Sequence, residues 1–442
     1  MNTMQYIANY RHLAGAIAIF LSNFAWAGIP VQQWTQASGA RVSLVESPAI
    51  PMVDVQIDFD AGSRRDPAAQ AGLASVTAGQ PALDENALSE AWADLGASFG
   101  AGAGSDRMSL TLRSLTYPDL LGKAVALAAR QIGAPAFPER EWLRDRERLK
   151  AALREAGTRP ATVANRAFEK AVFGQHPYGQ QTTDATLDRI TPADMRALYA
   201  RTVVACRAVV SVVGAVTRAQ ADAMVTQLLA GLPTGTTGGA PATCAPLPAV
   251  PEVLPLAAPL ELRLPFNSAQ AHVLIGQPGF RRNDPDFFAL TVGNYILGGG
   301  GFVSRLTAEV REKRGLSYSV YSHFSPGLQA GAFTVGLQTR PDQATQAVQV
   351  VRDVLKKFVA DGPTPAELQA AKDYFAGSFA LRIDTNQKLL GNISNMAWNH
   401  LPIDYLDTWT RQMEKVTADD IRAAFARKLR PETMVTVVVG GE

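Results

Sequence analysis

Residues 62–80 read GSRRDPAAQAGLASVTAGQ, and a similar frame returns as GFRRNDP at residues 279–285. Each stretch follows a run in which apolar and polar residues alternate, VDVQIDFDAG in the first case and AHVLIGQPG in the second. Such alternation predicts a strand that ends in a turn. The same unit therefore occurs twice, 217 positions apart (279 − 62 = 217), which indicates two halves with a common fold.

A second pair of segments supports this duplication. ITPADMRALY at residues 190–199 matches VTADDIRAAF at 416–425, and each has a Thr suited to cap a helix with acidic residues in the first turn. Each is followed by a Val-rich strand that ends in Gly, VVSVVG at 209–214 and VTVVVG at 435–440. Strands and helices come in blocks and do not strictly alternate, so we expect an α+β fold with mainly antiparallel sheets covered by helices.

A segment rich in Gly, Thr and Pro separates the two copies. It reads TGTTGGAPATCAPLPAVPEV, which is the composition of a linker. We place the first domain at residues 28–235, the linker at 236–253 and the second domain at 254–442.

The composition is that of a folded protein with large cores. Of the 442 residues 47% are hydrophobic and 19% are charged. The formal net charge is +2, and the chain has no basic block. Because phosphate binding needs clustered Lys and Arg, nucleic acid is not expected as a partner.

Residues 1–27 have the layout of a secretory signal peptide. Arg11 precedes the apolar run Leu13–Leu21, and Ala25-Trp26-Ala27 supplies a small-x-small cleavage signal before Gly28. The apolar run is too short to span ~30 Å of hydrocarbon, so we expect no stable membrane anchor, although a retained anchor is the alternative. Cleavage implies export, and a bacterial periplasm is the expected location.

Because the chain is expected to be exported, its two cysteines could form a disulfide. Cys206 and Cys244 are 38 residues apart (244 − 206 = 38), and the second lies in the linker. An oxidising compartment permits a disulfide between them. The spacing alone does not decide whether their Cα atoms come close enough, so the bridge stays open at this point.

The frame at residues 62–74 resembles the pitrilysin/insulinase (inverzincin) family of zinc peptidases. In that family the Gly-Leu-Ala runs into a helix that carries His-x-x-Glu-His, whose two His bind zinc and whose Glu takes a proton from the zinc-bound water. Here these positions are Ser75, Ala78 and Gly79, and none of them can do either. The alternative is an ordinary helix that matches the frame by chance.

The resemblance also implies where further zinc ligands would lie. Glu147 and Glu155 occupy the region in which the family has its third ligand. Without the His pair we interpret both as solvated charges on a helix. The chain has five His, all far apart in the sequence: His12, His176, His272, His323 and His400. We therefore expect this chain to bind no metal.

The second half keeps a different part of the family's site. Residues 294–321 read NYILGGGGFVSRLTAEVREKRGLSYSVY, which predicts a helix over 305–314 and a strand over 316–321. The segment resembles the family stretch in which an Arg and a Tyr, seven residues apart, bind substrate. These are Arg311 and Tyr318 in this chain. Without the resemblance, a solvated helix Arg and a packed strand Tyr would be the simpler interpretation.

The glycine run Gly298–Gly301 has a competing interpretation. Glycines can cradle phosphate, but this run lacks the Lys-Ser/Thr of a nucleotide loop and does not follow a strand. We interpret it as a tight turn before the helix of Arg311.

The resemblance covers essentially the whole mature chain. It implies a half-clamshell that is the non-catalytic subunit of a heterodimeric zinc metallopeptidase, inactive alone. A homologous partner would carry the zinc, and this chain would help to bind the peptide substrate. The alternative is a non-catalytic peptide-binding or scaffold protein of the cell envelope. An unrelated hydrolase is not supported, because the sequence has neither a Gly-x-Ser-x-Gly elbow nor a suitable Cys–His pair.

Overall fold

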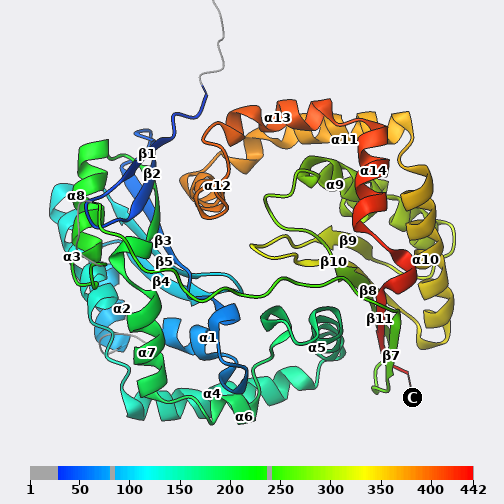
Figure 1. Ribbon diagram of the computed structural model, residues 1–442, viewed down its shortest axis with the longest axis horizontal. Coiled ribbons are helices and arrows are strands. Elements are labelled where there is room, and N and C mark those ends of the chain that lie inside the picture. Colours follow the sequence, from blue (N-terminus) through cyan, green and yellow to red (C-terminus); the bar gives the residue numbers. More distant parts are fainter. Residues whose placement is uncertain (1–27, 80–84, 236–240, 442) are drawn as a thin grey trace, which may run out of the picture.

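The computed structural model describes residues 28–79, 85–235 and 241–441 (Figure 1). Two sheets, each packed with helices, lie on opposite sides of the molecule, and the expected α+β fold is confirmed. The predicted signal peptide, residues 1–27, and part of the linker, 236–240, lie outside the described residues.

The two sheets have the same strand order. The first runs β1-β2-β6-β3-β5-β4 and the second β7-β11-β8-β10-β9, so that the orders match once β1 is set aside. Neighbours pair antiparallel except β2 with β6 and β7 with β11, which are parallel. The strands are β1 Gln32–Thr35, β2 Arg41–Glu46, β3 Met52–Phe59, β4 Ser98–Ala103, β5 Met108–Leu115, β6 Val209–Gly214, β7 Leu260–Leu264, β8 Ala271–Pro278, β9 Val320–Phe324, β10 Ala332–Thr339 and β11 Val435–Val439.

The repeated segments occupy equivalent places in the two halves. The predicted Thr caps, Thr191 and Thr417, each accept a hydrogen bond from the backbone of the third helical residue, and that residue's carboxylate bonds back to the cap. The Val-rich strands that follow are β6 and β11, and both are buried throughout. The repeated Val-rich segments thus form interior strands of the two sheets, paired on both sides.

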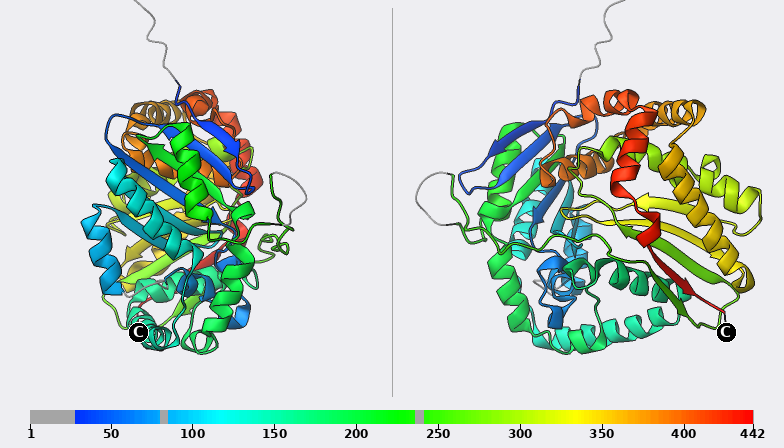
Figure 2. Two further views of the ribbon diagram at one scale, coloured as in Figure 1. Left: turned by 90° about the vertical axis from the view of Figure 1, so that its left-hand side faces the viewer. Right: turned by 45° about the vertical axis from the view of Figure 1, so that its right-hand side comes forward.

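Helices cover the outer faces of both sheets, as the turned views in Figure 2 also show. Apolar residues of α3 and α8 pack on the first sheet, and those of α9, α10 and α14 pack on the second. The helices are α1 Leu73–Ala78, α2 Glu85–Asp94, α3 Pro118–Gly133, α4 Glu139–Gly157, α5 Pro160–Phe173, α6 Asp184–Leu187, α7 Pro192–Thr202, α8 Arg218–Leu229, α9 Phe287–Asn294, α10 Ala344–Asp361, α11 Pro365–Ser378, α12 Asn386–Trp398, α13 Tyr405–Lys415 and α14 Ala418–Lys428.

One helix of each half packs against the sheet of the other half. Helix α5 of the first half packs Ala164, Phe168 and Val172 against β8 and β11 of the second. Helix α12 of the second half lies on β3 and β6 of the first, where Ser394 donates a hydrogen bond to the fully buried Asp58. The division of the chain by sequence at the linker therefore does not coincide with the division of its packing.

The part of the linker that the structure describes is fastened to the first half. Cys206 and Cys244 form a disulfide, with their Cα atoms 5.8 Å apart. Arg207 donates to the carbonyl of Ala245, and the His176 ring contacts the carbonyl of Pro251 at 2.9 Å. Over residues 28–79, 85–235 and 241–441, no helix has both the length and the apolar character needed to cross a membrane.

Candidate substrate-binding site

A buried carboxylate and a glycine with positive φ shape the start of helix α1. The buried Asp66 accepts hydrogen bonds from the backbone N–H groups of Gly72 and Ala74 and so caps the helix. Burial raises the pKa of Asp66 to about 6. Gly72 has φ of 105°, a conformation that a side chain would disfavour. The frame at residues 62–74 thus acts locally, by shaping the turn into α1.

The residues on α1 do not fit a zinc ion. Ser75 is exposed, while Ala78 and Gly79 border a pocket of about 180 Å³ whose lining contains no His, Cys, Asp or Glu. Glu155 pairs with Arg159, and Glu147 with Lys150. Across the described part of the chain, no three His, Cys, Asp or Glu side chains lie together as a metal site would require.

Arg311 and Tyr318 lie side by side on the second half. The guanidinium carbon of Arg311 is 4.6 Å from the centre of the Tyr318 ring and 4.7 Å from that of Phe302, so the cation lies against two aromatic faces. Tyr318 is 81% exposed and Phe302 is 68% exposed, and Val303 beside them is 73% exposed. Sequence reasoning found the first pair and missed Phe302, which directly follows the glycine run.

The segment that carries these residues differs in detail from the prediction. The helix begins at Arg305 as expected, but Thr307–Glu312 has the wider π-helical turn. Strand β9 begins at Val320 and not at residue 316, because its partner β10 pairs only with residues 320–324. Residues 316–319 are therefore free of strand pairing, and Tyr318 projects from an unpaired stretch.

Two contacts hold this segment in place. Gly298 lies so close to β9 that an added Cβ would be 2.6 Å from the backbone nitrogen of Ser322. Arg305 forms an ion pair with Glu367 and donates to the carbonyl of Gly362. Although burial alone would raise the pKa of Glu367, its bonds to Arg305 and to the Thr364 cap lower it to about 2. The glycine run thus permits close packing, but it is not the simple turn that we expected. Gly298 and Gly299 end a π-helix, Gly300 lies in a turn, and Gly301 begins a 3-10 helix.

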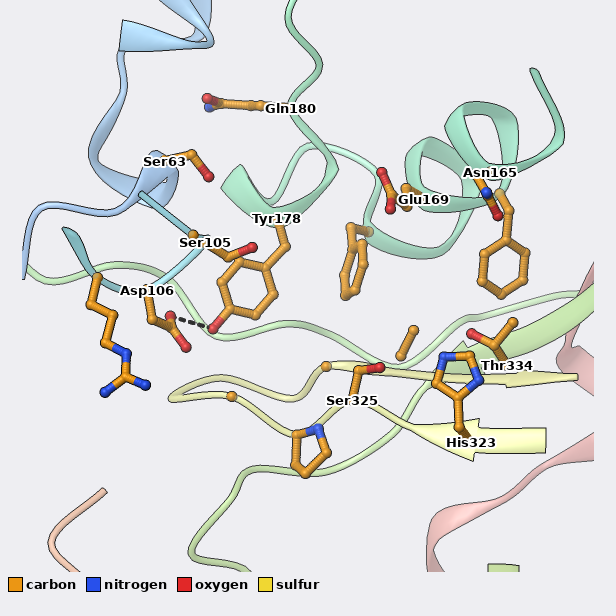
Figure 3. A pocket seen from close by; sticks show the side chains of 18 of the residues that line it. Ser63, Ser105, Asp106, Asn165, Glu169, Tyr178, Gln180, His323, Ser325 and Thr334 are labelled. Carbon is orange, nitrogen blue, oxygen red and sulfur yellow. Dashed lines mark hydrogen bonds between the residues drawn. The ribbon is translucent and has the colours of Figure 1, made fainter. Parts of the chain in front are cut away.

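A polar cavity of about 590 Å³ lies between the halves, lined by α5, the loop before β5, and β9 and β10 (Figure 3). On one wall Tyr178 donates to Asp106 at 2.5 Å. The backbone of Leu328, from the β9–β10 loop of the second half, donates to the same carboxylate at 2.8 Å. Burial and the bond to Asp106 raise the pKa of Tyr178. These bonds join the two halves across the cavity.

Glu169 of α5 and His323 of β9 line this cavity, and neither side chain has a hydrogen-bond partner in the described residues (Figure 3). Partial desolvation raises the pKa of Glu169 and lowers that of His323. His176, by contrast, accepts a hydrogen bond from the backbone of Tyr178, and its ring contacts the carbonyl of Pro251, so both ring nitrogens hold the surrounding loop. No sequence signal marked Glu169, because it belongs to a helix exchanged between the halves.

The cavity continues toward Tyr318. A second cavity of about 360 Å³ is bordered by Tyr318 and shares Asn165, Leu274 and Tyr321 with the first. Ala78 and Gly79 line neither of these two. The two cavities together can therefore hold an extended polar ligand along the inner surface, with Tyr318 at one end. Arg311 lines neither cavity but contacts the Tyr318 ring.

Comparisons with known proteins agree on one family. Residues 189–375 match the family model described as the peptidase M16 inactive domain. The crystal structure of the peptidase M16 inactive domain from Pseudomonas fluorescens is 34% identical, with a TM-score of 0.87, over 93% of this chain and 98% of that one.

Curated relatives carry mixed names. An uncharacterized zinc protease of Mycobacterium tuberculosis is 27% identical over 437 residues, which is 94% of each chain. Two shorter alignments span 33% and 36% of the relatives' own lengths. One is to an uncharacterized zinc protease of Streptomyces coelicolor, 38% identical over 156 residues, and the other to the non-peptidase homolog YmxG of Helicobacter pylori, 35% identical over 160 residues.

Proposed function

This chain belongs to the M16 peptidase family, and from that premise we propose that it is a non-catalytic subunit which binds peptide for a homologous, zinc-bearing partner. The partner supplies the metal and the attacking water. This chain supplies Arg311 and Tyr318, which hold the peptide near the scissile bond. The mature protein is exported, in keeping with a disulfide and with the leader-like residues 1–27.

One observation carries the proposal. Arg311 is held between two exposed rings, and its guanidinium has no hydrogen bond or ion pair with the described residues. Its five donors, which lie in the guanidinium plane, remain available to the carbonyl oxygens of a bound peptide. The Tyr318 hydroxyl, equally unpartnered, can donate to an oxyanion. Exposed apolar side chains that gather beside a cation are typical of a surface that a ligand or a partner covers.

The degenerate α1 explains why a partner is needed. With Ser75, Ala78 and Gly79 at the motif positions, the chain has no means there to hold zinc or to accept a proton from water. Its contribution to hydrolysis is therefore restricted to binding and polarising the substrate.

The test uses the mature protein, alone and in mixture. A tagged chain is isolated from its native source, and any homologue with His-x-x-Glu-His that accompanies it is purified separately. Metal content and cleavage of an unstructured fluorogenic peptide are then measured for each chain and for the mixture. We expect no stoichiometric zinc and no cleavage from this chain, and cleavage from the mixture. Full activity of the homologue alone would count against the proposal.

The second candidate is a peptide-binding or scaffold protein of the envelope with no part in hydrolysis. The name non-peptidase homolog, given to the Helicobacter pylori relative, favours considering it. A scaffold would not depend on the Tyr318 hydroxyl, whereas a complementing subunit would lose turnover without it.

A further inference from the structure

Residues 28–31 form a short strap between the two halves. Ile29 and Val31 pack against the apolar core of the second half, and from Gln32 the chain joins the first sheet as β1. In Figure 1 the strap passes beside the start of α13 before it reaches β1. The strap therefore spans the joint between the halves.

Asp407, in the first turn of α13, binds the backbone of this strap. The backbone N–H of Ile29 donates to its Oδ1 at 2.8 Å. A Cβ built on Gly28 would lie 2.6 Å from Oδ2, so the Asp407 carboxylate lies directly beside Gly28. Because the nitrogen and Cβ of one residue are about 2.5 Å apart, the nitrogen of Gly28 is within about 5 Å of Oδ2.

We propose that cleavage between Ala27 and Gly28 creates an ammonium group that Asp407 binds. Hydrolysis of that peptide bond by a signal peptidase consumes one water, leaves a carboxylate on Ala27 and frees the amine of Gly28. The amine is protonated below its usual pKa of about 8. Before cleavage the same nitrogen is a neutral amide, so the ion pair exists only in the mature protein.

The local charges suit this role. Asp407 is exposed and bonds within the described chain only to Ile29. The nearest charged residues along α13 are Asp404, one turn before it, and Arg411, one turn after it. The pair would fasten the new N-terminus to the second half while β1 stays in the first. Cleavage after export would therefore add an ion pair that links the two halves. This effect does not depend on any role in peptide hydrolysis.

Mass spectrometry of the exported protein tests the cleavage, and the pH dependence of acylation of the N-terminal amine gives its pKa. We expect a first residue of Gly28 and a pKa about 0.5 unit above the usual value, lowered again by Asp407→Asn. Asp404→Asn is the matched control and should leave the pKa unchanged.

A second variant keeps the proposal testable if Asp407→Asn is poorly folded. One Ala added before Gly28 moves the ammonium away from Asp407. We expect the amides of residues 29–31 to exchange about two- to fivefold faster in that variant. A mature chain that begins elsewhere, an equal pKa in the wild type and Asp407→Asn, or unchanged exchange would each overturn the proposal.

Discussion

The guanidinium carbon of Arg311 lies 4.6 Å from the centre of the Tyr318 ring, one on a π-helical turn and the other on the unpaired stretch that follows it. The contact restrains the Arg side chain through the ring face and uses none of its N–H groups. In the proposed role, this restraint would reduce the side-chain entropy that Arg311 loses when it binds a peptide.

Replacing Tyr318 with Phe should separate catalysis from binding. The ring, and with it the contact to Arg311, remains, while the hydroxyl is lost. In the mixed complex we expect turnover to fall by ~10²-fold, because one donor to the oxyanion is missing, with little change in peptide affinity. Steady-state kinetics and peptide binding by fluorescence anisotropy measure the two effects. Unchanged turnover would favour the scaffold role.

Replacing Phe302 with Ala should loosen Arg311. One of its two aromatic contacts disappears, at a cost of about 0.5–1 kcal/mol, so we expect KM for the peptide to rise about two- to fivefold with kcat little changed. Val303→Ala is the matched control, since Val303 is equally exposed and offers no ring. An equal rise in KM for both variants would mean that the patch acts through general apolar contact.

The ion pair between Arg305 and Glu367 should make stability depend on pH. The pKa of Glu367 is lowered from 4.5 to about 2 in the folded protein. Its stabilising effect is therefore fully present above pH 4.5 and is lost as the pH falls toward 2. Glu367→Gln should lower the free energy of unfolding by about 1–3 kcal/mol at neutral pH and by less at pH 3.

Urea unfolding at several pH values measures this difference. Glu312→Gln is the control. Glu312 ends the π-helical turn that follows Arg305, and it has no hydrogen bond or ion pair with the described residues. A difference between wild type and Glu367→Gln that stays constant from pH 7 to 3 would contradict the assignment.

Asp58 should be critical for joining α12 to the first sheet. It is fully buried and accepts bonds from Arg107, Ser109 and Ser394, so its removal leaves the Arg107 cation without its partner. We expect Asp58→Ala to destabilise the protein by about 3–5 kcal/mol in urea unfolding. Asp373→Ala, on the exposed face of α11, should change stability by no more than about 0.5 kcal/mol.

The sequence predicted the fold where local signals and the repeat agreed. Strands β3 and β8 show period-two alternation, and the Thr caps of α7 and α14 recur with the same spacing. These features are local in the chain, so they can be read without knowing what packs on them. The disulfide between Cys206 and Cys244, which the sequence left open, depended on how the linker turns back.

The sequence could not predict features that depend on contacts between distant segments. Phe302 became part of the candidate site because the π-helical turn brings Arg311 beneath its ring. The cavity lined by Glu169 and His323 exists because α5 crosses to the other sheet. The roles of Arg311 and Tyr318 themselves rest on resemblance, and their assignment stays a prediction until the variants are measured.

The exchange of α5 and α12 has a consequence for how the protein is made. If the gene were cut at the linker, the C-terminal fragment would expose the apolar face of β8 and β11 that α5 covers. The N-terminal fragment would expose a more polar face, on which Gln56 and Asp58 bond to Ser394 of α12. We therefore expect the C-terminal fragment in particular to aggregate when it is expressed singly. Expressed together they should reassemble. During synthesis, the face of the N-terminal sheet that α12 covers stays open until residues 386–398 have been made, so this face completes its packing late.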